Sequence, residues 1–154
     1  MSLIDTSSFP VGEDLDYESE EEVELLKVLS ARAWGFVDSY QWTPPIADLM
    51  LAFGIAPIIG LYVMRFEPGG KPEDRERWVV FGDLPSMHFE TDDTPTPAMA
   101  LEFYCDIAQD WADTVLSGQD LSDCYPIPVA PTREHAEMLL SRIETIRNDF
   151  IPLS

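Results

Sequence analysis

The chain has 154 residues, of which 29 are acidic and 9 are basic, so its formal net charge is −20. This length suits one ordinary domain, with or without a tail, and a hydrophobic content of 45% is too high for a wholly disordered chain. The charge argues against sequence-independent binding to DNA, RNA or anionic lipid, because each of these relies on a basic surface. No standard signature of a serine hydrolase, a phosphate-binding loop, a dinucleotide-binding fold or a zinc protease occurs.

Two further features bound the class of protein. The N-terminal residues lack the basic start and apolar run of a signal peptide, and the longest apolar stretch, 49–64, is shorter than the roughly 20 residues of a membrane helix. The two cysteines, Cys105 and Cys124, are too few for a disulfide framework and lack metal-ligand spacing. The sequence therefore predicts a cytoplasmic protein with reduced thiols, no membrane attachment, no cofactor and no metal site.

The N-terminal part of the chain predicts a tail followed by a helix. Residues 1–17 are rich in Ser, Asp and Glu and predict a flexible acidic segment, ahead of a single α+β domain over 18–154. Ser19 followed by Glu22 fits a capping box, in which the two side chains bond the free backbone N–H groups at a helix start. Apolar residues then recur at helical spacing, so a helix is expected over about 19–39.

The middle of the chain predicts a short helix and a small antiparallel sheet. A Thr-Pro-Pro run resembles a helix start, so a short apolar helix is expected over 45–53. Residues 57–67 are rich in β-branched and aromatic side chains, and 77–82 looks like a returning strand, which gives a hairpin with a long Pro- and Gly-rich loop. A short edge strand is expected over 86–90. Both hairpin strands are apolar on both faces, so helices should cover at least part of each.

Two long helices complete the predicted α+β fold, in which helices pack on a small antiparallel sheet. They are expected over 97–116, which Gly118 closes, and over 132–148, where apolar residues again follow a helical period. Three tryptophans fall on apolar faces and are predicted to lie in the core: Trp34, Trp78 and Trp111.

The helix over 97–116 carries the most specific pattern in the sequence. At about 100° per residue, four carboxylates project within about 80° of one another. These are Glu102, Asp106, Asp110 and Asp113. The apolar residues, including Met99 and Phe103, are expected to face mostly the other way. Like charges at i,i+4 disfavour a helix by about 0.2–0.5 kcal/mol per pair, and no basic residue on this helix relieves that repulsion.

The acidic pattern extends beyond this helix. Between Arg77 and Arg133 there is no Lys or Arg, while ten acidic residues occur. A surface of one sign attracts basic partners and speeds their encounter, so the four helix acids predict a partner-binding face, which Asp92 and Asp93 extend. Trp42, at a helix break, is a candidate exposed aromatic anchor. Solubility and adaptation to high salt are alternative explanations of the acidity.

A histidine with its neighbours and the paired carboxylates Asp92 and Asp93 are the candidates for a catalytic or metal site, and nothing else in the sequence assigns a role to the carboxylates. His88 follows a turn and has Asp83 and Glu90 nearby in sequence, and a histidine beside carboxylates can exchange protons or bind a metal. The spacing matches no metal site, and no third strong ligand is evident. An ordinary surface histidine is the simpler interpretation, and no catalytic residue is predicted.

One stretch carries a family resemblance. At Trp78-Val-Val-Phe-Gly-Asp-Leu-Pro85, followed by a helix with Phe103 and Trp111, the chain resembles a family of small uncharacterised bacterial proteins. The pattern of that family is Trp, three residues, Gly-Asp-Leu-Pro, then an amphipathic helix with a late Trp, and the likeness covers roughly 57–117. The family has no assigned activity, so the resemblance implies no catalytic residues. In size, acidity and lack of a catalytic signature the chain is also similar in type to bacterial immunity proteins, which block a cognate toxin.

These observations favour a non-catalytic, acidic binding protein. The leading hypothesis is an immunity- or antitoxin-like protein that neutralises a basic toxin or effector, with the helix carboxylates engaging Lys and Arg of the partner. Mimicry of a nucleic acid is a variant of this hypothesis. One alternative is a secretion-type chaperone for an effector, and another is a hydrolase with unrecognised carboxylate chemistry.

Overall fold

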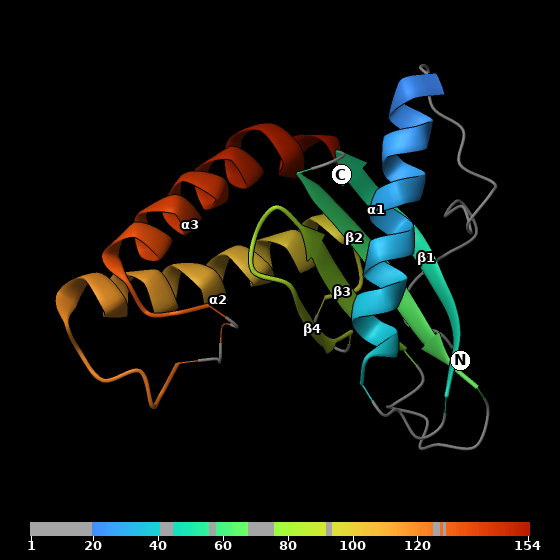
Figure 1. Cartoon of the computed structure of the whole chain (residues 1–154). Coiled ribbons are helices and arrows are strands. Elements are labelled where there is room, and N and C mark those ends of the chain that lie inside the picture. The colour runs from blue at the N-terminus through green and yellow to red at the C-terminus, as the bar shows by residue number, and fades with distance from the viewer. Residues whose placement is uncertain are drawn as a thin grey trace.

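The computed structural model of the chain confirms the α+β class, with helices packed on one antiparallel sheet (Figure 1). The structure describes residues 20–40, 45–55, 58–67, 76–91, 94–124, 127 and 129–154. The predicted acidic tail over 1–17 and the predicted cap at Ser19 lie outside the described residues.

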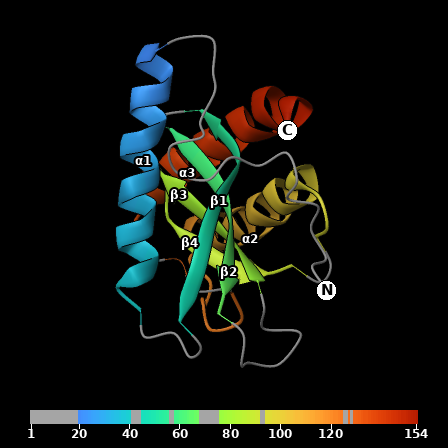
Figure 2. The same cartoon turned by 90° about the vertical axis from the view of Figure 1, so that its right-hand side faces the viewer.

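The sheet is a four-stranded antiparallel meander in which each strand pairs with the next along the chain (Figure 2). The strands are β1 (Ile46–Ile55), β2 (Ile59–Phe66), β3 (Glu76–Gly82) and β4 (Met87–Glu90). The predicted hairpin and the predicted short edge strand are thereby confirmed. Consecutive strands lie side by side without a crossover, which is the usual arrangement for neighbouring elements of an antiparallel sheet.

The prediction of a short helix over 45–53 is wrong, because this segment forms β1. Its Ala, Leu and Met residues favour a helix intrinsically, but the segment pairs along its length with β2. Met50 packs into the core on one face of the sheet and Leu51 into the core on the other. This alternation has the period of a strand, and the register shifts twice, between Ile46 and Asp48 and between Leu51 and Phe53, which blurs the period in the sequence.

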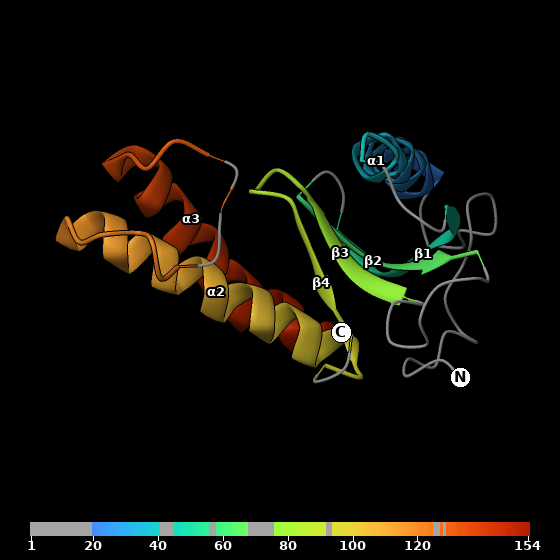
Figure 3. The ribbon, with the colours of Figure 1, turned by 90° about the horizontal axis from the view of Figure 1, so that it is seen from below.

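Helices cover both faces of the sheet, as the two-sided apolar strands predict (Figure 3). Helix α1 (Glu20–Asp38) lies on one face and matches the predicted helix over 19–39. Helices α2 (Pro97–Ser117) and α3 (Arg133–Thr145) lie together on the other face. The six residues from Ile59 to Met64 are therefore all buried, and side chains of this strand reach both cores.

The ends of α2 and α3 follow the expected capping chemistry. The Thr96 hydroxyl accepts a hydrogen bond from the Met99 N–H, and Gly118 closes α2 with φ of 73°, a conformation that favours glycine. Thr132 caps α3 in the same way. The sequence predicts that the last helix reaches residue 148, but the α-helical part ends at Thr145 and continues as a π-helical turn, Ile146–Phe150. A 3₁₀ turn, Ile151–Leu153, follows.

Two of the three tryptophans predicted in the core lie there. Trp78 is fully buried, and its indole N–H donates to the Thr94 carbonyl at 2.8 Å. Trp111 is also buried. The prediction for Trp34 is wrong, because its side chain is 39% exposed. It comes directly after the buried Ala33, so the 100° step around α1 turns it past the edge of the face that meets the sheet.

Candidate functional site

The acidic face predicted on α2 exists as an exposed helix face. All four predicted carboxylates belong to exposed residues, and the side chains of Glu102 and Asp106 are 50% and 65% exposed. We call the exposed side of this helix the α2 face. Its members are Met99, Glu102, Phe103, Asp106, Asp110 and Asp113.

The α2 face is not purely acidic, which corrects one expectation. The expectation that Met99 and Phe103 face the core is wrong, because their side chains are 46% and 38% exposed. At about 100° per residue, Met99 lies inside the arc of the four acids and Phe103 lies about 20° beyond Asp110, so the helical period itself places both on the outer side. The buried side of α2, which includes Tyr104 and Ala108, lies across the helix from this arc. The Phe103 ring also packs on the ring of Phe89 in β4, with 4.9 Å between ring centroids. The face therefore offers partly exposed apolar side chains among its carboxylates.

A basic residue from another element partly neutralises this face. Arg147, in the π-helical turn after α3, donates from Nη2 to the Asp106 carboxylate at 2.8 Å, and its Nε lies 3.4 Å from Glu102 Oε1. It also donates to the side chain of Gln109. The repulsion between carboxylates on α2 is thus relieved from outside the helix. Sequence reasoning missed this contact because Arg147 lies 41 residues from Asp106.

The other two carboxylates of the α2 face, Asp110 and Asp113, have no paired cation among the described residues. Of the nine basic residues, Lys71 and Arg75 lie outside the described residues. The other seven each contact an acid, a histidine or an aromatic ring within the chain; they are Lys27, Arg32, Arg65, Arg77, Arg133, Arg142 and Arg147. Within the described part of the chain, no cation pairs with Asp110 or Asp113. These two side chains therefore carry uncompensated charge toward solvent.

Three other predicted partner-binding residues, Asp92, Asp93 and Trp42, lie outside the described residues. The structure brings together the four acids on α2 and does not address these three.

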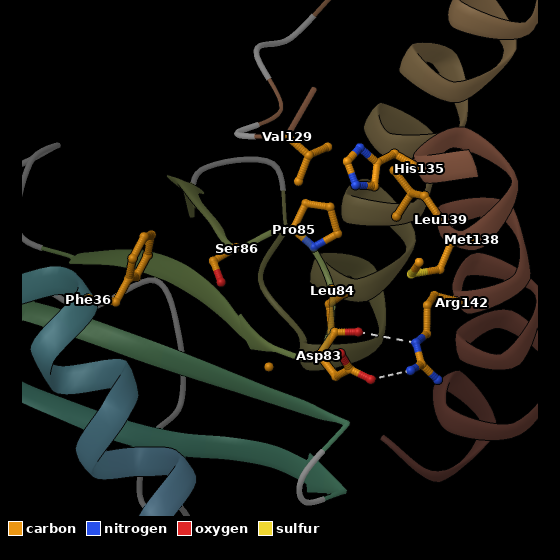
Figure 4. Close-up of a pocket in the computed structure, with 11 residues that line it drawn as sticks. Phe36, Asp83, Leu84, Pro85, Ser86, Val129, His135, Met138, Leu139 and Arg142 are labelled. Carbon is orange, nitrogen blue, oxygen red and sulfur yellow. Dashed lines mark hydrogen bonds and ion pairs between the residues drawn. The ribbon is translucent and has the colours of Figure 1, made fainter. Parts of the chain in front are cut away.

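A second feature is a pocket of about 490 Å³ on another part of the surface. We call it the turn pocket, because residues 82–86, from the last residue of β3 to the residue before β4, form much of its lining (Figure 4). Phe36 of α1 and residues of α3, including Met138 and Arg142, form its other sides. Sequence reasoning missed it, because its lining comes from segments distant in the chain.

Three elements fix the turn that lines this pocket. Arg142 of α3 donates from Nε to the Asp83 carbonyl at 3.1 Å and forms an ion pair with the Asp83 carboxylate (Figure 4). The Tyr104 hydroxyl of α2 donates to the Pro85 carbonyl at 2.8 Å. The Asp83 N–H donates to the Ile58 carbonyl at 2.8 Å. The Gly-Asp-Leu-Pro sequence is thus a rigid turn that joins the sheet to both helices.

The candidate catalytic histidine, His88, is hydrogen-bonded to an arginine of the neighbouring strand. Arg77 Nε donates to His88 Nδ1 at 3.0 Å, so this nitrogen is an acceptor and carries no proton. Burial, and then the neighbouring Arg77 charge, lower the pKa of His88. Asp83, meanwhile, pairs with Arg142. Among the described residues no group of three or more His, Cys, Asp or Glu side chains could hold a metal ion.

The two free cysteines differ sharply in environment, and this predicts their reactivity. Burial raises the pKa of Cys105 to about 12, whereas Cys124 is only half-buried. At pH 8 the reactive thiolate form of Cys105 is about a thousandfold less populated than that of a cysteine with an ordinary pKa. We therefore expect Cys124 to react first with iodoacetamide. Mass spectrometry of the modified peptides checks this. Equal labelling of both thiols in the native protein would contradict the buried position of Cys105.

Together these features define an α+β protein with a helix-covered antiparallel meander and a negatively charged helix face. A domain of unknown function (DUF4826) matches residues 49–149, more than half of the chain, so the protein belongs to this family. The match is longer than the stretch 57–117 that carries the sequence resemblance, and it agrees with that resemblance in assigning no activity. No curated protein and no solved structure matches the chain. None of the described helices is long and apolar enough to cross a membrane.

Proposed function

We propose that this protein is a non-catalytic binding protein whose α2 face docks on a basic protein. In its specific form, the proposal is an immunity- or antitoxin-like protein of a bacterial cytoplasm that neutralises a basic toxin or effector. The observation that carries it is the uncompensated charge of Asp110 and Asp113, in a chain of net charge −20 whose seven described basic residues all have contacts within the chain.

The α2 face combines two kinds of interaction that protein interfaces use. Its carboxylates attract a basic surface over several ångströms and raise the rate of encounter, an effect that salt screens. Phe103 and Met99 supply partly exposed apolar surface beside the charges. Aromatic anchors of this kind contribute much of the affinity at interfaces, while surrounding charges mainly set the association rate and the choice of partner.

The partner class follows from this chemistry. Proteins that act on nucleic acid carry basic clefts that bind phosphates. A row of carboxylates on a rigid helix presents similar charge and can occupy such a cleft. We therefore expect the protein and a nucleic acid to compete for the same partner, and simultaneous binding of both would exclude this form of the proposal.

The test compares partner capture by two variants of equal charge. The first changes the four acids of the α2 face to amides: Glu102→Gln, Asp106→Asn, Asp110→Asn and Asp113→Asn. The control changes four other exposed acids: Glu21→Gln, Asp48→Asn, Glu67→Gln and Asp123→Asn. Both variants have the same net charge, so only the position of the removed charges differs.

We expect the first variant to lose the basic partner that the unmodified protein captures from cells of its source, with the association rate lowered about tenfold or more. The control variant should capture the partner like the unmodified protein. Circular dichroism and the melting temperature confirm that both variants fold. Equal recovery by the two variants would remove the α2 face from the mechanism.

A further inference from the structure

The turn pocket lies apart from the α2 face, between the C-terminal part of α1, the turn 82–86 and α3 (Figure 4). Six of its eleven lining residues are apolar: Phe36, Leu84, Pro85, Val129, Met138 and Leu139. Its volume of about 490 Å³ falls within the roughly 300–1,000 Å³ of typical binding pockets. The pocket can therefore hold an apolar group larger than one small side chain.

Met138 shows most clearly that apolar surface at this pocket is left uncovered by the rest of the described chain. Its side chain is 58% exposed, although α3 already anchors itself through Ala136, Leu139 and Ile143. Figure 4 shows Met138 on the α3 wall, near Leu84 of the turn. A methionine side chain is flexible and polarisable, so it adapts to varied apolar groups and is common at binding surfaces.

The charges around the pocket select the occupant. Its single arginine, Arg142, is paired with Asp83. One exposed acid, Glu134, lies one turn of α3 before Met138 and so on the same side of the helix, and it forms no ion pair with the described residues. The last turn of α1, which also ends here, has no basic residue to offset the negative end of its dipole. A bound segment with Lys or Arg beside its apolar side chains would complement the negative charge around the pocket, whereas one with Asp or Glu there would be repelled.

We propose that the turn pocket is a second binding site, which takes one or two apolar side chains from an amphipathic segment flanked by Lys or Arg. The basic character of this segment rests on the proposed function, since the same overall charge selects basic partners at both sites. The site itself is independent, because none of its lining residues belongs to the α2 face. Recognition through an apolar groove is an established way of binding an amphipathic peptide.

The methionines of the chain let one experiment read both sites separately. Met99 lies on the α2 face and Met138 in the turn pocket, while Met50, Met64 and Met87 are buried. The full-length protein, labelled with carbon-13 in its methionine methyl groups, is titrated with a synthetic helical peptide of leucine and lysine and followed by NMR. Two matched peptides serve as controls: one has serine in place of leucine, and the other has glutamate in place of lysine.

We expect the leucine–lysine peptide to shift the Met138 methyl signal saturably, and neither control peptide to do so. Met138→Lys should weaken binding at this site about tenfold or more, because it removes apolar contact and repels the cationic peptide, whereas Met99→Lys should not. The affinity at the pocket in both variants is followed by isothermal titration calorimetry and through the backbone amide signals of the turn. Both lysine variants replace exposed side chains, so both should fold.

The failures of the two proposals are distinguishable. If only the Met99 signal shifted, the pocket proposal would be overturned and the α2 face would remain a binding site. If only the Met138 signal shifted, the pocket proposal would be supported and binding of the basic peptide at the α2 face would be contradicted. An equal response of Met138 to the leucine–glutamate peptide would overturn the charge selection. A Met138 signal that moves with protein concentration and without peptide would show that a second copy of the chain fills the pocket, which also overturns the proposal.

Discussion

Replacing Trp78 with alanine is expected to lower the free energy of unfolding by about 3–5 kcal/mol, the usual cost of removing a large buried aromatic side chain. Trp78 is fully buried between the sheet and the α2–α3 layer. The change also removes the indole N–H that donates to the Thr94 carbonyl at 2.8 Å, on the segment that leads into α2. Urea unfolding followed by far-ultraviolet circular dichroism measures the change.

Trp34→Ala is the matched control, since it removes the same side chain from a position that is 39% exposed. Its expected cost is about 1 kcal/mol or less, in line with partly exposed substitutions. If the two alanine variants lost similar stability, Trp78 would not be the central core residue that the structure shows.

Replacing Gly82 with alanine is expected to cost about 2 kcal/mol or more, through backbone strain and a direct clash. Gly82 has φ of 153°, and a Cβ at this position would clash with the Ile58 carbonyl oxygen. That oxygen accepts the hydrogen bond of the Asp83 N–H, so it cannot move away without loosening the turn. Thermal unfolding of the purified variant checks the prediction.

Gly35→Ala provides the opposite control within the same chain. Gly35 lies in α1 and is exposed, and a Cβ at this position would have no neighbouring atom within 4 Å outside its own stretch of the helix. Alanine there should raise stability by up to about 1 kcal/mol, because glycine is a poor helix former. A Gly82→Ala variant as stable as Gly35→Ala would contradict the geometry of the turn.

Both sensitive positions belong to the Trp-Val-Val-Phe-Gly-Asp-Leu-Pro stretch, and each has a structural role. Trp78 fills the core, Gly82 allows the close approach to Ile58, and Asp83 and Pro85 bond to α3 and α2. These contacts account for the stretch without any catalytic chemistry. They also explain why the turn pocket, which this turn lines, has a rigid base.

Most of the fold could be predicted from the sequence because its strongest signals are local. The helix period of α2, its threonine cap and its terminal glycine are all readable within about 20 residues. The segment of β1 gives a false helix signal, because its composition favours a helix and its two register shifts interrupt the strand period. Pairing with β2 decides its conformation, and that pairing is tertiary.

The candidate site divides in the same way. The four carboxylates of the α2 face could be predicted, since helical spacing alone places them together. The contact of Arg147 with two of them could not, because it depends on how α3 lies against α2. The exposure of Met99 and Phe103 could be predicted as well, since a step of about 100° per residue places both beside these carboxylates.

The central claim is that the α2 face is the surface that meets a basic partner. Hydroxyl-radical footprinting of the protein, alone and bound to its captured partner, measures this directly, since the Met99 and Phe103 side chains are exposed in the free protein. We predict that oxidation of both falls several-fold in the complex, while that of Leu25 on α1, which is 41% exposed, stays the same. Unchanged oxidation of Met99 and Phe103, with protection on another element, would contradict it.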